Sequence, residues 1–344
     1  MVNVGIIGCG GIASFRHIPA LKLIPEKATV YGFFDGMAGR AEEYAQKYGG
    51  KAYASLEEML ADPAIDAVDV CTATRSHCEL TVKALEAGKH VLCEKPMAAS
   101  AADARAMIAA AGKSGKKLMI SHNQRFYEPH QKAKELLEAG EIGSLITFRT
   151  FLGIKGPEYS SALGVNNMYF SRALSGRGVM SDVGSHRIDL MHYIVGSRYK
   201  RVLSYTPTLA KRGPDGNLIG VDDNAMSIVE MENGVVGLMV YSWTSMSGND
   251  RMTQFFGTEG VITLYGPDCA VKVEKKDGTV TKIDFADNPH QDVTLLTHID
   301  ESFIDCIEHD TAPFITGEDG LEVVLCIDAM EQSNLTGGWA EVAR

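Results

Sequence analysis

The 344-residue sequence lacks most features that mark a membrane, disulfide-rich or nucleic-acid-binding protein. Its longest apolar runs, such as residues 234–241, fall far short of the ~20 residues that cross a bilayer. The N-terminus has no positive charge or apolar core of a signal peptide. The seven cysteines are scattered without a C-x-x-C pair, which indicates neither a disulfide framework nor a thiolate zinc site. We therefore expect a cytoplasmic protein with reduced thiols.

Charge and composition narrow the class further. With 33 basic and 44 acidic residues the net charge is −11, so the sequence carries no basic footprint for nucleic acid. Apolar residues make up 45% and charged residues 22%, which is ordinary for a globular protein and excludes general disorder. At roughly 150 residues per domain, the length predicts about two domains.

Short apolar runs alternate with helical patterns over residues 1–122. The predicted strands cover residues 2–7, 29–34, 67–71, 90–93 and 117–120. The predicted helices between them include residues 40–48, 76–87 and 100–113. Repeated strand–helix–strand units predict an α/β domain, a doubly wound parallel sheet of the Rossmann type. The strand runs lack strict alternation, as expected where both faces of a sheet are buried.

Residues 123–344 have a different pattern. Helices are predicted at 128–138, 182–195, 294–308 and 318–333, and a strand at 145–152. Residues 153–178 are rich in glycine and tyrosine and predict a long functional loop. From residue 202 to 285, strand-like segments follow one another across turn signals such as Glu232-Asn233-Gly234. The second part is therefore predicted to be an α+β domain on a large, mostly antiparallel sheet.

A glycine-rich turn follows the first predicted strand. Gly8-Cys9-Gly10-Gly11-Ile12-Ala13 fits the dinucleotide pattern G-x-G-x-x-[G/A], which permits a tight turn and close approach of a pyrophosphate to the backbone. The following helix would offer its N-terminal amides to the phosphates. Such turns also occur for packing alone, so the motif needs a second element.

Asp35 supplies that element at the end of the second predicted strand, ~20 residues after the glycine turn. A carboxylate there accepts hydrogen bonds from the adenosine ribose hydroxyls and repels a 2′-phosphate. Arg40 could reach such a phosphate only with Asp35 turned away. The sequence therefore favours NAD over NADP, although a strand-end carboxylate in an ordinary turn is the alternative interpretation.

Glu94-Lys95-Pro96 directly follows the predicted strand 90–93, at the sheet edge where ligands of open α/β folds bind. A lysine there can hydrogen-bond a substrate hydroxyl and stabilise negative charge on its oxygen. The alternative is a surface lysine beside a turn proline. Since only X–Pro bonds adopt cis readily, Lys95–Pro96 is also a candidate cis peptide.

The predicted helix from Asp182 places several polar residues on one stripe. At 100° per residue, His186 lies about +40°, Asp189 about −20° and Tyr193 about +20° from Asp182. Such a stripe can line a site or face water. A metal site with His192 is disfavoured, because His192 falls about 80° from Asp182 on the other side from His186.

Together the glycine turn, Glu94-Lys95-Pro96 and the stretch Gly176–His186 resemble the glucose–fructose oxidoreductase/inositol dehydrogenase (Gfo/Idh/MocA) family. The resemblance extends over the whole chain, including Asn123-Gln124-Arg125-Phe126 at the domain junction. It implies a catalytic trio of Lys95, Asp182 and His186 and a second domain whose open sheet often forms oligomer contacts. One departure is Thr72-Ala73-Thr74, where family members often have Thr-Pro-Asn.

The resemblance extends the predicted site beyond the trio, with no metal. The predicted cofactor-binding residues are Gly8, Gly10, Gly11, Ile12, Asp35, Thr72, His77, Glu94, Lys95 and Asn123. The weaker substrate-binding predictions, for which ordinary loop or packing roles remain open, are Arg125, Tyr159 and Tyr169.

The predicted function is an NAD-dependent dehydrogenase that moves a hydride between a secondary alcohol of a sugar, glycoside or cyclitol ring and nicotinamide. His186 would be the general base, Asp182 would position the hydroxyl or the imidazole, and Lys95 would stabilise alkoxide character. Asp189 is interpreted as a partner that orients His186. The alternative is a redox-neutral enzyme that keeps NAD tightly bound and cleaves a glycoside through transient oxidation. A dinucleotide sensor without catalysis is disfavoured by the intact trio. We expect a homo-oligomer, a dimer or tetramer.

Overall fold

The computed structural model describes residues 1–161, 163–248, 250–285 and 298–344. The chain divides into two compact units. The first comprises Met1–Asn123 with Thr294–Leu321, and the second comprises Gln124–Val293 with Glu322–Arg344.

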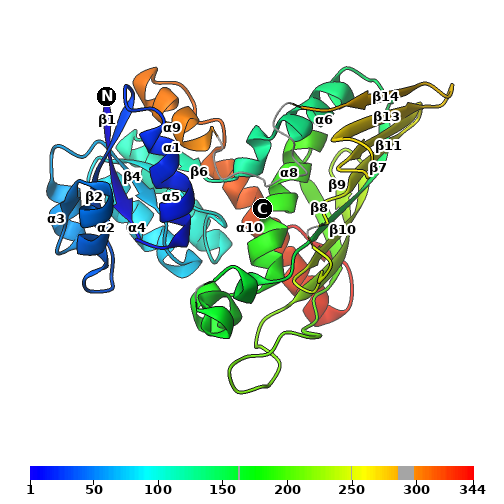
Figure 1. Ribbon diagram of the computed structural model, residues 1–344. Coiled ribbons are helices and arrows are strands. Elements are labelled where there is room, and N and C mark those ends of the chain that lie inside the picture. The colour runs from blue at the N-terminus through cyan, green and yellow to red at the C-terminus, as the bar shows by residue number, and fades with distance from the viewer. Residues whose placement is uncertain (162, 249, 286–297) are drawn as a thin grey trace. The chain divides into compact units, whose positions relative to one another are not determined.

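The first unit is built on a six-stranded parallel sheet of strand order β3-β2-β1-β4-β5-β6 (Figure 1). Its strands are β1 (Val2–Ile7), β2 (Ala28–Phe34), β3 (Lys51–Ala52), β4 (Ala67–Val70), β5 (His90–Cys93) and β6 (Leu118–Ile120). The order reverses between β1 and β4, which is the switch point at which open α/β sheets bind ligands. The predicted parallel Rossmann sheet is confirmed.

Helices connect these strands and bury both sheet faces. The helical segments are η1 (Ala13–His17), α1 (Ile18–Lys22), α2 (Arg40–Tyr48), α3 (Leu56–Ala61), α4 (Thr74–Glu86), α5 (Ala101–Ser114) and α9 (Ile299–Glu308). Helix α4 packs on α5, and α1 packs on α9. All four residues of β4 are buried, which explains why the strand sequences show no alternation.

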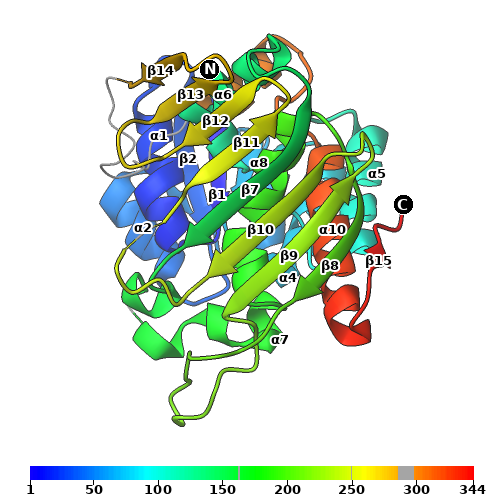
Figure 2. The same ribbon diagram turned by 90° about the vertical axis from the view of Figure 1, so that its right-hand side faces the viewer.

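The second unit carries a nine-stranded sheet of order β14-β13-β12-β11-β7-β10-β9-β8-β15, shown face-on in Figure 2. In the described part of the chain every neighbouring pair is antiparallel except β7 with β10. The strands are β7 (Leu145–Gly153), β8 (Tyr199–Tyr205), β9 (Asn224–Met231), β10 (Val236–Ser242), β11 (Thr253–Gly257), β12 (Gly260–Leu264), β13 (Val271–Lys275), β14 (Val280–Ile283) and β15 (Ala340–Glu341). The mostly antiparallel sheet is therefore confirmed.

Helical segments lie before and between these strands in the sequence. They are η2 (Asn123–Phe126), α6 (Glu128–Glu138), η3 (Pro157–Tyr159), η4 (Gly164–Asn166), η5 (Met168–Phe170), α7 (Arg172–Ser175), η6 (Met180–Gly184), α8 (Ser185–Val195) and α10 (Gly317–Thr336), which begins in the first unit. Residues 153–178, predicted as a loop, consist of short 3₁₀ turns and the one-turn helix α7 among their described residues.

On one face of the nine-stranded sheet, β9 and β10 carry exposed apolar side chains. Along β9 and β10, buried Val229 and Met239 alternate with Met226, Ile228 and Leu238, which are 38%, 39% and 46% exposed. In Figure 2 no helix lies between the viewer and these strands. Leu203, Ile228 and Leu238 are cross-strand neighbours, so half-buried Leu203 continues the row formed by the exposed side chains of Ile228 and Leu238.

The chain returns to the first unit near its end. Residues 298–321 pack there, with Ile120 N–H donating to the carbonyl of Ile315 at 3.2 Å. Our sequence-based division put residues 123–344 in a single second domain, which does not include this return. In the described residues, no helix combines the length and apolar character needed to cross a bilayer. The predicted helix start at 294–297 lies outside the described residues.

Candidate active site

The glycine turn has the geometry that its sequence predicts. Gly8 adopts φ +98°, and a Cβ there would lie 2.9 Å from the carbonyl carbon and oxygen of Cys71, so only glycine fits. A Cβ at Gly10 would meet nothing within 4 Å, which leaves this backbone open to a ligand. The helix that follows begins directly after Gly10, and its first amides point out of the N-terminus. The turn therefore fits the pyrophosphate of a dinucleotide.

Asp35 lies beside this turn at the end of β2. Its Oδ2 accepts the Cys9 amide at 2.7 Å and its Oδ1 accepts the Met37 amide at 2.7 Å. These bonds hold the carboxylate beside the glycine turn, and its role in ribose recognition stays a prediction. Tyr44 from α2 was not predicted, yet its hydroxyl donates to the Gly10 carbonyl at 2.9 Å and supports the turn.

The segment after β4 is tied to the Glu-Lys-Pro turn. The Ser76 hydroxyl donates to Thr72 Oγ1 at 2.8 Å. The two ring nitrogens of buried His77 lie 3.0 Å from the Thr72 carbonyl and 2.9 Å from the Pro96 carbonyl. Burial lowers the pKa of His77, so the ring is neutral and donates to one carbonyl at a time. His77 thus links the two segments, although the motif here departs from Thr-Pro-Asn.

Glu94 and Lys95 directly follow β5, and the Lys95–Pro96 bond is cis, as predicted. Glu94 is 5% exposed, and its Oε2 accepts the Lys95 amide at 3.0 Å. Burial would raise the pKa of Glu94, but the hydrogen bond and charge of His17, with Arg16 and Lys95, lower it to about 2. The carboxylate is therefore ionised and anchors the backbone of Lys95. Asn123 is also buried, just beyond the end of β6.

In the second unit, Asp182 lies in the π-helical segment η6, and His186 lies in the first turn of α8. π-Helical turns are rare and concentrate at functional sites. Because a π turn contains more residues than an α turn, the uniform 100° step of the sequence analysis does not describe the rotation from Asp182 to His186. The predicted stripe holds only for the α-helical part.

Trp243 fixes the Asp182 carboxylate. Its indole N–H, fully buried, donates to Asp182 Oδ2 at 3.2 Å, and the Phe170 ring packs on it with centroids 6.0 Å apart. The sequence analysis missed Trp243. One of only two tryptophans, it follows a strand and carries a donor that must be satisfied when buried, which was the available signal.

Asp222 holds the start of the same segment. Its carboxylate accepts the amides of Gly178 and Met180 at 2.9 and 2.7 Å. A Cβ at Gly178 would lie 1.8 Å from the Asp222 carbonyl oxygen, so this close approach requires glycine. Two chain segments more than 40 residues apart thus set the position from which Asp182 projects.

Asp189 has a different partner from the predicted one. Its carboxylate accepts three hydrogen bonds from Arg125 at 2.6–3.1 Å, and both side chains are buried. The interpretation that Asp189 orients His186 is therefore replaced by a buried ion pair that ties η2 to α8. The same pair occupies the Arg125 guanidinium, which had been predicted to contact substrate.

The two predicted substrate tyrosines lie in the segment after β7. Tyr159 is 63% exposed, and the ammonium of Lys211 lies 5.2 Å from its ring centroid. Lys211 is itself held by Glu158 and by the Lys155 carbonyl. Tyr169 is half-buried, and its carbonyl accepts the Ser175 hydroxyl at 3.2 Å. Their roles as substrate ligands stay predictions.

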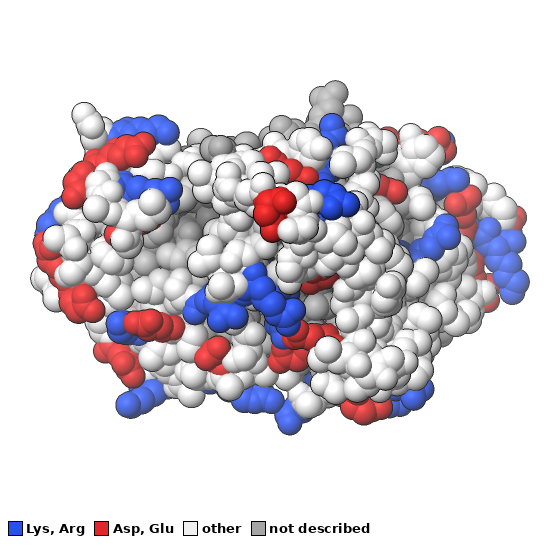
Figure 3. Space-filling view, turned by 90° about the horizontal axis from the view of Figure 1, so that it is seen from below, with Lys and Arg blue, Asp and Glu red and all other residues white. Residues whose placement is uncertain are grey.

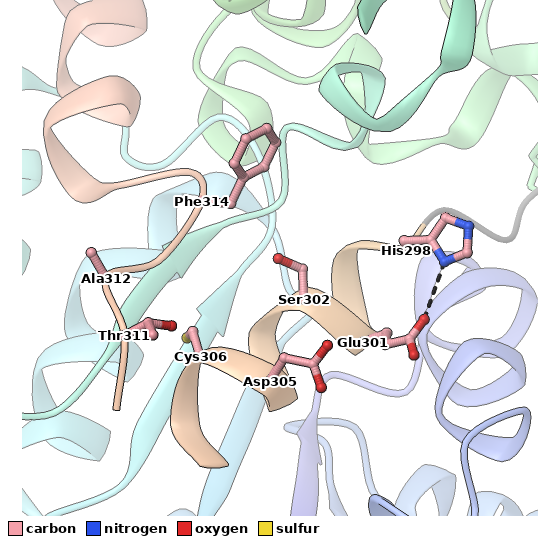
Figure 4. Close-up of a pocket in the computed structure, with 8 residues that line it drawn as sticks. All are labelled: His298, Glu301, Ser302, Asp305, Cys306, Thr311, Ala312 and Phe314. Carbon is pink, nitrogen blue, oxygen red and sulfur yellow. Dashed lines mark hydrogen bonds and ion pairs between the residues drawn. The ribbon is translucent and has the colours of Figure 1, made fainter. Parts of the chain in front are cut away.

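A cavity of about 560 Å³ lies along α9 in the first unit, lined by residues 298–314 (Figure 4). It contains none of the predicted site residues. Its carboxylates Glu301 and Asp305 are paired with Lys27 at 2.8 and 2.9 Å. This cavity is therefore not where the predicted chemistry lies. On the face shown in Figure 3, several basic side chains gather near the middle of the view, and acidic and basic side chains are interspersed elsewhere.

Comparison with known proteins places these features in context. Residues 2–122 match a family described as an oxidoreductase family with an NAD-binding Rossmann fold, GFO_IDH_MocA. Residues 130–263 match the GFO/IDH/MocA C-terminal domain. Together the two matches cover more than half of the chain and meet near the boundary between the units.

Individual relatives match over nearly the full length. The chain is 30% identical over 342 residues to a 1,5-anhydro-D-fructose reductase of Ensifer adhaerens, covering 98% of each. It is 28% identical over 340 residues to a myo-inositol 2-dehydrogenase of Thermotoga maritima, covering 96% of each. A levoglucosan dehydrogenase solved with NADH and levoglucosan has a TM-score of 0.87 at 26% identity, with 99% of both chains covered.

Proposed function

The chain belongs to the Gfo/Idh/MocA family of NAD-binding oxidoreductases, and from that premise we propose that it oxidises a secondary alcohol on a sugar, glycoside or cyclitol ring. The observation that carries this proposal is the Rossmann unit with its open glycine turn, on the same chain as a π-helical segment that presents Asp182 and is followed by His186. The relatives named above are a reductase and dehydrogenases of such molecules. Their names do not favour the redox-neutral alternative.

The first unit binds NAD. Bound NAD supplies a nicotinamide that accepts a hydride at C4. The glycine turn and the helix N-terminus hold the pyrophosphate, and Asp35 accepts hydrogen bonds from the adenosine ribose. The nicotinamide end of the site is shaped by Thr72, His77, Glu94 and Asn123. Glu94 and His77 act there by holding the Lys95–Pro96 turn.

The remaining chemistry falls to the catalytic trio. The imidazole of His186 would take the hydroxyl proton, while the hydride on the same carbon would be accepted by bound NAD, which leaves a C=O bond. The Lys95 ammonium stabilises negative charge on the oxygen during this step. Asp182, held by the Trp243 indole, positions the hydroxyl or the imidazole. Tyr159 and Tyr169 contact the substrate ring, whereas Arg125 supports α8 through Asp189.

The test is a screen of sugars, glycosides and inositols with NAD, followed by NADH absorbance. We expect NADH to accumulate with at least one ring alcohol, and the rate to rise with pH as the imidazole of His186 loses its proton and then to level off. His186→Ala should lower turnover by roughly 10²–10⁴-fold and leave NAD affinity unchanged. Release of an aglycone without NADH would replace the proposal by the redox-neutral alternative.

We further propose that the exposed row on β8, β9 and β10 forms a contact between copies of this chain. Continuous exposed apolar surface on a sheet marks an interaction site. Ile228 and Leu238 provide such surface, and half-buried Leu203 adjoins it. Leu238→Glu should convert an oligomer to smaller species in light scattering. Leu335→Glu, at a 74% exposed apolar residue on α10, is the matched control. A wild-type monomer would contradict the proposal.

We place the protein in the cytoplasm. All seven cysteines are free thiols, as expected in a reducing compartment. Fractionation of the source cells should recover the NAD-dependent activity with cytosolic markers.

A further inference from the structure

A cluster of buried ionisable side chains lies behind the Glu-Lys-Pro turn of the first unit. His17, at the end of η1, is 1% exposed. Its Nδ1 lies 2.8 Å from Asp300 Oδ1, and its Nε2 lies 3.1 Å from Glu94 Oε1. The hydroxyl of Ser121 donates to the same Glu94 oxygen at 2.8 Å. Only Glu94 belongs to the site predicted above.

The two carboxylates that flank His17 favour a charged imidazole. Both ring nitrogens of His17 face carboxylate oxygens, which only accept, whereas a neutral ring has a single N–H to donate. Burial lowers the pKa of His17, but its contacts with Cys71 and Asp300 outweigh burial and raise it well above 6.5. The thiol of Cys71 has its pKa raised to about 11 and is neutral, so the Asp300 carboxylate supplies the balancing charge.

The same carboxylate that receives His17 holds Lys95. Glu94 uses Oε1 for His17 and Ser121, and its Oε2 accepts the backbone amide of Lys95 at 3.0 Å. A single hydrogen-bonded path therefore runs from Asp300 through His17 and Glu94 to the backbone of the predicted catalytic lysine.

We propose that His17 is a positioning residue for Lys95: its imidazolium, clamped by Asp300, fixes the Glu94 carboxylate that holds the lysine backbone. This inference rests on the proposed function, since it assigns a supporting role for the lysine of that site. The proposal also assigns a role to α9. This helix, orange in Figure 1, packs on α1, and its first turn contributes Asp300.

Stability alone does not account for such a cluster. Replacing buried ion pairs by well-packed apolar side chains is often neutral or stabilising, so the charged version is better explained by the geometry it imposes. His17 also ends the π-helical segment that follows the glycine turn. The path thus joins the glycine-turn helix, the Glu-Lys-Pro turn and the segment that returns late in the chain.

A direct test measures the Lys95 amide. In protein labelled with [¹⁵N]lysine, we expect amide exchange at Lys95 to accelerate at least tenfold in His17→Gln and in Asp300→Asn. Lys27→Gln is the matched control. Lys27 binds Glu301 and Asp305 on α9, so the control removes another tether of the same helix without touching Glu94. Unchanged Lys95 exchange in both cluster variants would overturn the proposal.

The second readout is catalytic. In His17→Gln we expect kcat to fall at least tenfold, with KM for NAD changed less than threefold, because the glycine turn and Asp35 are untouched. The pH–rate profile should gain a new ionisation, since Glu94 without its cation has its pKa raised by burial. Faster Lys95 exchange with unchanged kcat and an unchanged profile would refute the positioning role.

Two further measurements on the wild type test the role of His17 independently of the proposed function. With [¹⁵N]histidine, both ring nitrogens of His17 should be protonated at pH 8, and a neutral ring would overturn the proposal. His17, Asp69 and Asp300 also offer ligand atoms within 4.8 Å of one another, so a stoichiometric divalent ion in the purified protein would reassign the cluster as a metal site. If no substrate yields NADH, the proposed function fails, while the exchange and ring measurements still decide the role of His17.

Discussion

The buried pair of Arg125 and Asp189 gives a prediction for the stability of the second unit. In the structure both side chains are buried, at 4% and 0% exposed, and they share three hydrogen bonds. Asp189→Asn removes the negative charge that receives these three hydrogen bonds and leaves the guanidinium buried.

The burial of the pair sets the expected loss in free energy of unfolding for Asp189→Asn. Removing one partner of a buried ion pair costs about 3–5 kcal/mol, because the remaining charge stays desolvated. An exposed pair contributes about 0–1 kcal/mol. Lys200 with Glu230, at 2.7 Å and with Lys200 52% exposed, is such a pair in the same unit. Lys200→Gln is therefore the matched control.

Urea unfolding followed by tryptophan fluorescence measures the stability of the second unit, which contains the pair. Both tryptophans, Trp243 and Trp339, belong to the second unit. At a slope of about 2 kcal/mol per molar urea, the loss predicts a midpoint lowered by about 1.5–2.5 M for Asp189→Asn. Lys200→Gln should shift it by less than about 0.5 M.

The reasoning fails if Asp189→Asn unfolds within about 0.5 M of the wild type. A paired apolar variant, Arg125→Met with Asp189→Leu, should recover much of the lost stability, because no buried charge then remains. Retention of activity by that double variant would also show that Arg125 does not contact the substrate.

Three other predictions follow from single contacts. Trp243→Phe keeps the packing but removes the hydrogen-bond donor to Asp182. We therefore expect kcat/KM to fall roughly tenfold with NAD affinity unchanged. Equal kinetics of variant and wild type would show that the indole does not position the Asp182 carboxylate. The wild-type enzyme should have a kcat/KM at least roughly tenfold higher with NAD than with NADP, and Asp35→Ser should lower this NAD-to-NADP ratio. Equal use of both cofactors by the wild type would contradict the role of Asp35. Burial raises the pKa of Asp69 to about 8, against the attraction of His17, so the folded state holds a proton that the unfolded chain releases near pH 4. The stability that this group contributes falls as pH rises from about 4 to 8. Asp69→Asn should therefore raise the urea midpoint of the first unit, followed by far-UV circular dichroism, more at pH 8 than at pH 5, and the reverse order would exclude a protonated Asp69.

Local sequence rules accounted for much of the first unit. The glycine turn, Asp35 and Glu94-Lys95-Pro96 each end a strand of a parallel sheet, and the carboxyl ends of such strands meet at one edge. Spacing along the chain was therefore enough to predict which residues gather there. The cis Lys95–Pro96 bond was also predictable, because proline alone makes that isomer accessible.

Local rules failed where a position depends on a distant segment. The rotation of Asp182 relative to His186 is set by a π turn that Asp222 caps from more than 40 residues away, and no periodicity in the helix itself reports this. Trp243 could be suspected as a buried donor, but its acceptor could not be named. The linear boundary at residue 122 likewise could not show that residues 298–321 rejoin the first unit.

The sequence by itself determined the kind of protein: its α/β and α+β halves, its dinucleotide turn and the order of its motifs. These depend on local propensity, on periodicity and on the fixed geometry of a parallel sheet, all of which act over short stretches of chain. The tertiary structure alone decided the pairings of buried charges. It joined Asp189 to Arg125 and His17 to Asp300 and Glu94, over separations of 64, 283 and 77 residues. A buried charge must find its partner wherever the fold delivers one, and that choice is made by packing rather than by neighbours in the sequence.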